Sequence, residues 1–241
     1  MALSNPTDTD QPEEATTEAP GPGGRTPRER FDALAQSIKD LILDKYRDWN
    51  VAHIDWWDGV YDCFKSEMEE LGIEVDRMYF SGFWSQGDGA CFEGRVSEWE
   101  KFLQALGYSD SALINHAVDH FSFYVKHSGH YYHENCTQFS ADLPLPEHDE
   151  DTHFAESYCN YERDGIQEAV WLALLSKYSW SDLEARFIEF FKDKMLELYR
   201  RLEEEYDYLT SDDAVLEALE ANEQLEDAIN DAITEEEEEY A

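Results

Sequence analysis

Apolar residues recur every three or four positions in several segments of the chain, which predicts amphipathic helices. The first predicted helix begins at Thr26, where Pro27 suits the first helical position and Glu29 completes a capping box, and it extends to Tyr46. The other predicted helices cover residues 55–72, 97–107, 109–118 and 163–179, a long segment from 181 and a last segment from 210. The inward positions of the long segment are Leu183, Phe187, Phe190, Phe191, Leu198 and Leu202.

Other segments have the short, β-branched and aromatic composition of strands. The sequences IEVDRMYFSGF, residues 73–83, and ACFEGRV, residues 90–96, flank a turn motif of Gln86, Gly87, Asp88 and Gly89. Asp-Gly suits the positive φ angles of a type I′ turn, so these segments predict a β-hairpin. A second hairpin is predicted over residues 120–141, with a two-residue turn at Ser128 and Gly129.

Together these elements predict an α+β fold. We expect a small antiparallel sheet of about four strands in two hairpins, packed by helices from the N- and C-terminal parts of the chain. Residues 1–25 are rich in Pro, Thr, Glu and Gly and predict a disordered acidic tail. Residues 26–232 are expected to form a single domain with an acidic C-terminal helical part, and residues 233–241 a second acidic tail.

The charge of the chain restricts the kinds of partner it can meet. Of 241 residues, 42% are hydrophobic and 14% aromatic, enough for a sizeable core, but the formal net charge is −38. Such a charge repels phosphates, so direct binding of nucleic acid is excluded. A basic partner, a cation or simple solubility remains.

Targeting signals are not apparent in the sequence. The first residues contain no apolar stretch like that of a signal peptide, and the longest apolar run is too short to span a bilayer. The four cysteines, Cys63, Cys91, Cys136 and Cys159, form no CxxC pair. We therefore expect reduced thiols and a cytoplasmic location.

The glycine-rich stretch at residues 80–94 allows three interpretations: a phosphate-binding loop, a catalytic loop or a turn. A phosphate loop needs its glycines between a strand and a helix, whereas these lie between two strands. A nucleophile at Cys91 needs a neighbouring base, and none is apparent in the sequence. The turn is therefore favoured, and it predicts that Asp88→Asn leaves folding nearly unchanged, since Asn tolerates the same backbone angles.

Three histidines and a cysteine in the second hairpin have a spacing that suggests zinc: His127, His130, His133 and Cys136. With a turn at Ser128-Gly129, His127 would face His130 across the hairpin and His133 would lie on the other face. At most two histidines then converge, too few for a closed zinc site. We therefore predict packed or surface histidines, no metal and no cofactor, with zinc as the alternative.

Carboxylates are concentrated in the last third of the chain, where residues 181–241 hold 22 acidic side chains against 5 basic ones. They are too abundant to single out a catalytic acid–base pair, and residues 149–156 lack the pattern of an EF-hand. Glu189, Asp193 and Glu197 lie four apart on the long helix, about 6 Å from one to the next. Two such acidic helices together would approximate the phosphate spacing of DNA. The predicted partner-binding residues are Glu189, Asp193, Glu197, Glu203, Glu204 and Asp207.

Three stretches carry a resemblance to a known group of proteins: YFSGFWSQGDGACFEG, HSGHYYHENC and EEEYDYLTSDDAVLEALEANE. Together they resemble a family of poorly characterised bacteriophage and prophage proteins, some of which are labelled antitoxin. The resemblance covers about residues 49–222 and implies no catalytic residues. In overall charge the chain also resembles phage inhibitors that mimic DNA.

These observations predict a phage or mobile-element protein without enzymatic activity. It would inhibit a host defence nuclease of the CRISPR or restriction type by binding its basic nucleic-acid channel as a DNA mimic. One alternative is an antitoxin-like or scaffolding partner of a basic protein. A second is a metal-dependent enzyme that uses the glycine-rich loop or the histidine hairpin. The sequence leaves the partner and the oligomeric state open.

Overall fold

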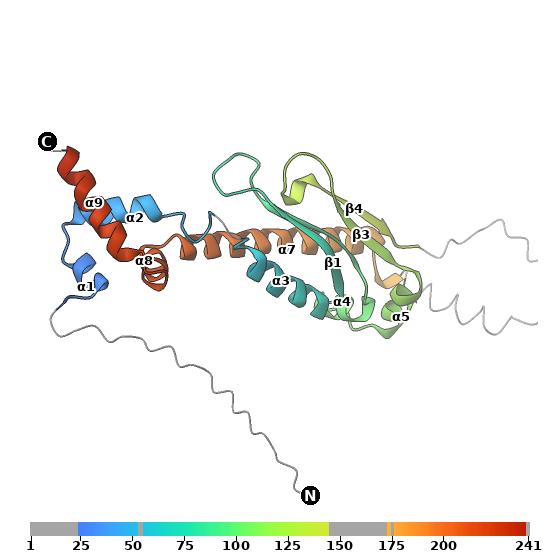
Figure 1. The fold of residues 1–241 in the computed structure, drawn as a ribbon. Coiled ribbons are helices and arrows are strands. Elements are labelled where there is room, and N and C mark those ends of the chain that lie inside the picture. The colour runs from blue at the N-terminus through green and yellow to red at the C-terminus, as the bar shows by residue number, and fades with distance from the viewer. Residues whose placement is uncertain (1–23, 53–54, 145–172, 175, 240–241) are drawn as a thin grey trace, which may run out of the picture. The chain divides into compact units, whose positions relative to one another are not determined.

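The computed structural model describes residues 24–52, 55–144, 173–174 and 176–239 (Figure 1). It has an α+β fold with one four-stranded antiparallel sheet flanked by helices, as the sequence predicted. We expected one domain over residues 26–232, whereas the contacts of the chain form two compact units. Of the described residues, those within 47–215 form the larger unit, and the smaller unit joins residues 24–46 with 216–239.

The larger unit contains the whole sheet and the longest helix. Its strands are β1 (Ile73–Phe80), β2 (Ala90–Val96), β3 (Ser122–His127) and β4 (Thr137–Asp142). Its helices are α3 (Asp58–Glu70), α4 (Trp99–Ala105), α5 (Ser111–His120), the short 3-10 helix η1 (Glu134–Cys136) and α7 (Trp180–Leu209). Most of the predicted helix at 163–179 lies outside the described residues.

The sheet has the order β1-β2-β3-β4, so each strand pairs with its neighbour in sequence. The register of the second hairpin differs from the prediction, since His127 pairs with Thr137 and not with His130. Residues 128–136 form a long connection, closed by a hydrogen bond from Ser128 N to Cys136 O (2.8 Å). The two-residue turn was wrong because η1 occupies the positions that we assigned to the returning strand.

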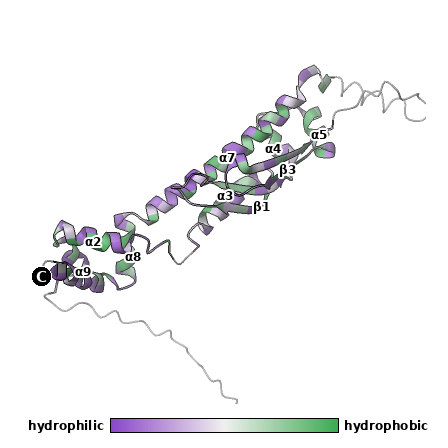
Figure 2. Ribbon diagram, turned by 90° about the horizontal axis from the view of Figure 1, so that it is seen from above, coloured by the Kyte–Doolittle hydropathy of each residue, from purple (hydrophilic) through white to green (hydrophobic). Residues whose placement is uncertain are grey.

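The core of the larger unit lies between the sheet and the helices α3 and α7, which contact β1 and β2 respectively. Helix α7 presents one apolar stripe to this core, visible as alternating green and purple bands along the helix in Figure 2. Met195 takes a buried position that we did not predict, and Phe190 is only partly buried because it lies one step off the stripe. The buried residues of the stripe are Leu183, Phe187, Phe191, Met195, Leu198 and Leu202.

The smaller unit is helical, and ion pairs connect its N-terminal helices to its C-terminal helix. Helices α1 (Pro27–Asp32) and α2 (Gln36–Tyr46) both contact α9 (Leu225–Glu239). The capping box of Thr26 and Glu29 is present, but the helix predicted to run to Tyr46 is interrupted between α1 and α2. Lys45 Nζ lies 2.7 Å from Glu235 Oε1, and Arg30 pairs with Glu226. Helix α9 thus includes residues 233–239 of the segment expected as an acidic tail at 233–241. Helix α8 (Asp212–Ala221) spans the boundary between the units.

Asp110 caps α5 and provides a test of the larger unit. Its Oδ1 accepts from Ala112 N (3.0 Å), and its Oδ2 binds Lys177 Nζ and accepts from Tyr178 OH (3.2 Å). Lys177 holds the pKa of Asp110 below its ordinary value. We expect Asp110→Ala to lower the free energy of unfolding by about 1 kcal/mol at neutral pH, and Asp110→Asn to cost less because the amide oxygen still caps.

The pH dependence and a control sharpen this prediction. A carboxyl whose pKa is lowered by folding stabilises the protein above its unfolded pKa of about 3.9, and this contribution is lost as the pH falls. The difference between wild type and Asp110→Ala, measured by urea unfolding, should therefore narrow in acid. Glu98 precedes α4 without a side-chain cap bond, so Glu98→Ala is the control. Equal losses in the two alanine variants would contradict the capping role.

Candidate functional site

The connection between β1 and β2, residues 81–89, is an ordered loop held by Asp88. Oδ2 of Asp88 accepts hydrogen bonds from Trp84 N (2.9 Å) and Ser85 N (2.6 Å). A backbone bond from Ser81 N to Gly89 O (3.1 Å) closes the loop. The predicted type I′ turn at Asp88-Gly89 is wrong, since neither residue has a positive φ, whereas Gly87 has φ 101°. The loop is longer than a two-residue turn and is built around a carboxylate.

Residues 128–136 pack closely against this loop. A Cβ at Gly87 would lie 2.4 Å from Cδ1 of Tyr131, and a Cβ at Gly89 would lie 2.7 Å from both Tyr132 O and His133 Cβ. Real Cβ atoms essentially never approach other atoms so closely, so both glycines allow the second connection to lie against the first. Two of the stretches that carried the family resemblance therefore meet here.

Aromatic rings of α7 and of the segment before α3 contact the other side of the loop. The ring centroids of Phe83 and Tyr206 are 5.3 Å apart, and those of Trp84 and Tyr206 are 5.2 Å apart. Trp56 lies 5.7 Å from Tyr206, and Phe83 lies 5.6 Å from Tyr199. Trp84 is 77% exposed. The aromatic patch is the group Trp56, Phe83, Trp84, Tyr199 and Tyr206.

Carboxylates lie near two rings of the aromatic patch, Tyr199 and Tyr206. Tyr206 OH lies 3.5 Å from Oδ1 of Asp48. Burial raises the pKa of Tyr206, and the charges of Asp48 and Asp207 raise it further. Burial likewise raises the pKa of Tyr199, with Glu203 and Asp88 adding to the effect. The acidic rim is the group Asp48, Asp88, Glu203 and Asp207.

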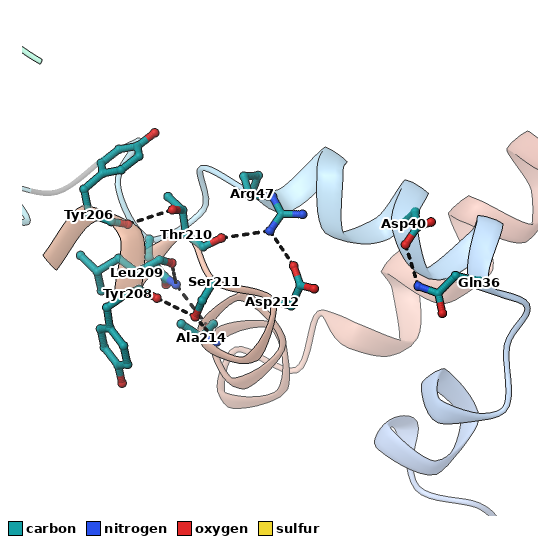
Figure 3. A network of polar contacts seen from close by, with 11 residues as sticks. Gln36, Asp40, Arg47, Tyr206, Tyr208, Leu209, Thr210, Ser211, Asp212 and Ala214 are labelled. Atoms are coloured by element: carbon teal, nitrogen blue, oxygen red, sulfur yellow. Dashed lines mark hydrogen bonds and ion pairs between the residues drawn. The ribbon is translucent and has the colours of Figure 1, made fainter. Parts of the chain in front are cut away.

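The end of α7 next to this surface is fixed by polar contacts (Figure 3). Arg47 Nη1 donates to Thr210 O (3.1 Å) and to Asp212 Oδ1 (2.6 Å). Thr210 Oγ1 donates to Tyr206 O (2.8 Å). Asn50 Nδ2 donates to Leu209 O (2.9 Å). The segment before α3 is thus tied to the C-terminal end of α7, which holds Tyr206 in position.

The region from Trp56 to Asp212 matches a family model described as "Domain of unknown function (DUF8835)". This match covers more than half of the chain. The chain belongs to this family. No curated protein and no solved structure matched significantly. The matched region includes the sheet, α7 and almost all of the site, whereas Asp48 precedes it.

The acidic stripe predicted on α7 of the DUF8835 region is interrupted by bases. Glu197 lies between Lys194 (Nζ to Oε2, 2.7 Å) and Arg201, which also binds Glu67 through both of its terminal nitrogens. Burial alone would raise the pKa of Glu197, but Lys194 and Arg201 hold it below its usual value. Its charge is therefore compensated within the protein.

Glu189 and Asp193 are exposed but also have basic neighbours. They line an open groove of about 870 Å³ together with Arg186 and Lys192. Glu203, Glu204 and Asp207 are likewise exposed and form no ion pair with any described residue, and Arg200 lies about one helical turn before Glu203 and Glu204. The C-terminal third of α7 holds four carboxylates, Glu203, Glu204, Glu205 and Asp207, and lies beside the aromatic patch.

Two separate cysteine–histidine contacts lie in the DUF8835 region. Cys91 Sγ lies 3.8 Å from His127 Nδ1, and Cys136 Sγ lies 3.6 Å from His133 Nε2. His130 contacts the ring of Tyr131. Within the described ranges, no group of three or more His, Cys, Asp or Glu side chains is placed to hold a metal ion. The contact of Cys91 with His127 was missed because it depends on the tertiary pairing of β2 with β3.

The thiol of Cys91 is not prepared for nucleophilic attack. Its side chain is completely buried, and burial raises its pKa to about 12. A thiol with so high a pKa stays protonated near neutral pH, and the thiolate is the nucleophile. The Cys91–His127 contact therefore belongs to the packing of the sheet.

We expect the loop to depend on an oxygen acceptor at position 88. Asp88→Ala removes the acceptor for two backbone N–H groups and should lower the free energy of unfolding by about 1–2 kcal/mol. Asp88→Asn should cost less than 1 kcal/mol, because its amide oxygen can accept the same bonds. Urea unfolding of both variants, with Asp76→Ala on the exposed part of β1 as control, provides the measurement. An Asp88→Ala variant with the same free energy of unfolding as the parent would contradict this role.

Among the residues that the structure describes, no helix combines the length and apolar character needed to cross a membrane.

Proposed function

We propose that this protein is a phage or mobile-element inhibitor that binds a basic, nucleic-acid-binding host protein, namely a defence nuclease of the CRISPR or restriction type. The observation that carries the proposal is the group of exposed carboxylates Glu203, Glu204 and Asp207 at the C-terminal end of α7, in a chain with net charge −38. Helix α9 adds a second exposed acidic segment in the smaller unit, drawn mostly purple in Figure 2.

The mechanism is occupation of a channel that normally holds phosphates. A basic channel concentrates negative charge, so an acidic helix gains both association rate and affinity from the same field that attracts DNA. We propose that the binding face is narrower than the six residues first predicted. Glu197 is compensated by Lys194 and Arg201, so Glu203, Glu204 and Asp207 carry the interaction instead of the Glu189–Glu197 stripe.

The test is inhibition and binding of purified CRISPR effector and restriction complexes at increasing ionic strength. Binding should weaken steeply with salt, because each neutralised charge contributes to the salt dependence. The triple variant Glu203→Gln, Glu204→Gln, Asp207→Asn should lose at least tenfold in affinity, about 1.4 kcal/mol. The pair Glu189→Gln, Asp193→Asn on the same helix is the matched control and should change affinity little.

Two outcomes would overturn the proposal. One is affinity that is absent, or indifferent to salt, across these complexes. The other is capture of a small basic toxin from host cells with stoichiometric binding, identified by mass spectrometry, which would replace the nuclease with an antitoxin-like role. In that case the affinity of the triple variant for the toxin would show whether Glu203, Glu204 and Asp207 bind it.

A further inference from the structure

The aromatic patch exposes an unusually large ring on an ordered loop. Single exposed apolar residues are common and carry little meaning. Trp84, however, is 77% exposed, and its ring is in contact with Phe83 (5.9 Å) and Tyr206 (5.2 Å). Its backbone N–H is held by Asp88. The ring of Trp84 packs against Phe83 and Tyr206 on one side and is exposed to solvent on the other. Its side chain therefore loses little conformational entropy when a partner binds it.

The surroundings of Trp84 select the chemistry of what covers it. A purely apolar partner would bury the carboxylates of the acidic rim without compensation, which is unfavourable. A cation satisfies both features, because it is attracted to the face of a tryptophan ring and to carboxylates. Arginine is the best match, since its planar guanidinium stacks on an aromatic ring while its N–H groups bind carboxylate oxygens.

We infer that the aromatic patch binds an arginine side chain presented by the partner protein, with the guanidinium on the face of Trp84 and its N–H groups directed to Glu203 and Asp207. This inference deepens the proposed function, on which it rests, by naming the side chain that the partner contributes. It also assigns a role to the loop stretch FWSQGDG, residues 83–89, which the acidic-helix mechanism leaves unused.

The protein uses the same combination of ring and carboxylate within its own fold. The guanidinium of Arg201 lies 5.9 Å from the ring centroid of Phe64 while both of its terminal nitrogens bind Glu67. The guanidinium of Arg186 likewise lies over the ring of Tyr108, at 5.8 Å. At the aromatic patch the ring and the carboxylates are present and exposed, and an arginine from outside would complete the arrangement.

The test compares two short peptides of equal charge, one with arginines and one with lysines spaced by glycine, titrated calorimetrically into the full chain. The arginine peptide should bind at least threefold more tightly than the lysine peptide. Trp84→Ala should weaken binding of the arginine peptide about tenfold, which corresponds to about 1.4 kcal/mol, and it should remove most of the preference for arginine over lysine. The affinity of Trp84→Phe for the arginine peptide should lie between those of the parent and of Trp84→Ala, because phenylalanine is a weaker cation–π partner than tryptophan.

Matched controls separate the site from general charge attraction. Tyr124 is also an exposed aromatic residue, 52% exposed on β3, and Tyr124→Ala should leave the peptide affinity unchanged. Glu203→Gln with Asp207→Asn should weaken the arginine peptide more than Glu189→Gln with Asp193→Asn does. Trp84→Ala should retain the melting temperature of the parent, since its side chain is mostly exposed, so lost binding cannot be attributed to unfolding.

The results distinguish this inference from the proposed function. Equal affinity for the two peptides, or unchanged binding by Trp84→Ala, overturns the arginine site and leaves only general attraction between charges. If Trp84→Ala still inhibits a nuclease complex at full strength, the inhibitory function stands and the arginine site fails. If Trp84 selects arginine peptides while no nuclease complex is bound, the site stands and the partner is another arginine-bearing protein.

Discussion

Replacing Phe191 with alanine should lower the free energy of unfolding by about 3–5 kcal/mol, the largest loss expected for a single side chain in this protein. Phe191 is completely buried. Its ring centroid lies 5.0 Å from that of Phe123 and 5.8 Å from that of Phe92, so it joins α7 to two strands. Removing the ring leaves a cavity that the surrounding rings fill only partly.

The neighbouring phenylalanine provides the control for this measurement. Phe190 occupies the adjacent position on α7 and is only partly buried, so Phe190→Ala should cost clearly less. Urea unfolding of the two variants, followed by far-UV circular dichroism, compares them directly. Equal losses would mean that the apolar stripe of α7 is not oriented as the structure shows.

Gly89→Ala should lower the free energy of unfolding by about 2–3 kcal/mol. The added Cβ would lie 2.7 Å from Tyr132 O and from His133 Cβ, and backbone atoms cannot rotate away as a side chain can. The β1–β2 loop, residues 81–89, and the connection at residues 128–136 would have to move apart. Besides lowering the urea midpoint, the change should therefore weaken binding of the arginine peptide, because the loop that holds Trp84 would shift.

Gly59→Ala is the matched control for this substitution. Gly59 lies in α3, and nothing is within 4 Å of a Cβ placed there. Gly59 is the second residue of α3, and alanine is favoured over glycine in helices, so this variant should be as stable as the parent or more so. A harmless Gly89→Ala would show that the two connections do not touch as closely as described here.

Much of the architecture follows from periodicity and capping residues. The α+β class and the four antiparallel strands were predicted, because a two-residue and a three-to-four-residue apolar period are local properties of the sequence. The capping box of Thr26 and Glu29 formed as predicted, because both of its hydrogen bonds lie within one helical turn. The core positions of α7 were predicted with the exceptions of Met195 and Phe190.

The candidate site was predicted only in part. The glycine-rich loop was recognised as a connection between strands, but its geometry was assigned from the dipeptide Asp-Gly alone. Asp88 instead accepts hydrogen bonds from residues three and four positions earlier, which a two-residue turn does not provide. The aromatic patch was not predicted at all, since Trp56, Trp84 and Tyr206 are far apart in sequence.

The sequence by itself determined the elements of this protein, its negative charge and the acidic character of the end of α7. Each depends on residue type and on spacing within one segment. The tertiary structure alone decided which charges are compensated and what the glycines do. Arg201 on α7 binds Glu67 on α3, and Gly89 is needed because residues 128–136, far away in sequence, pack against it. Long-range contacts of this kind depend on how elements pack, and packing leaves no periodic signal in a single sequence.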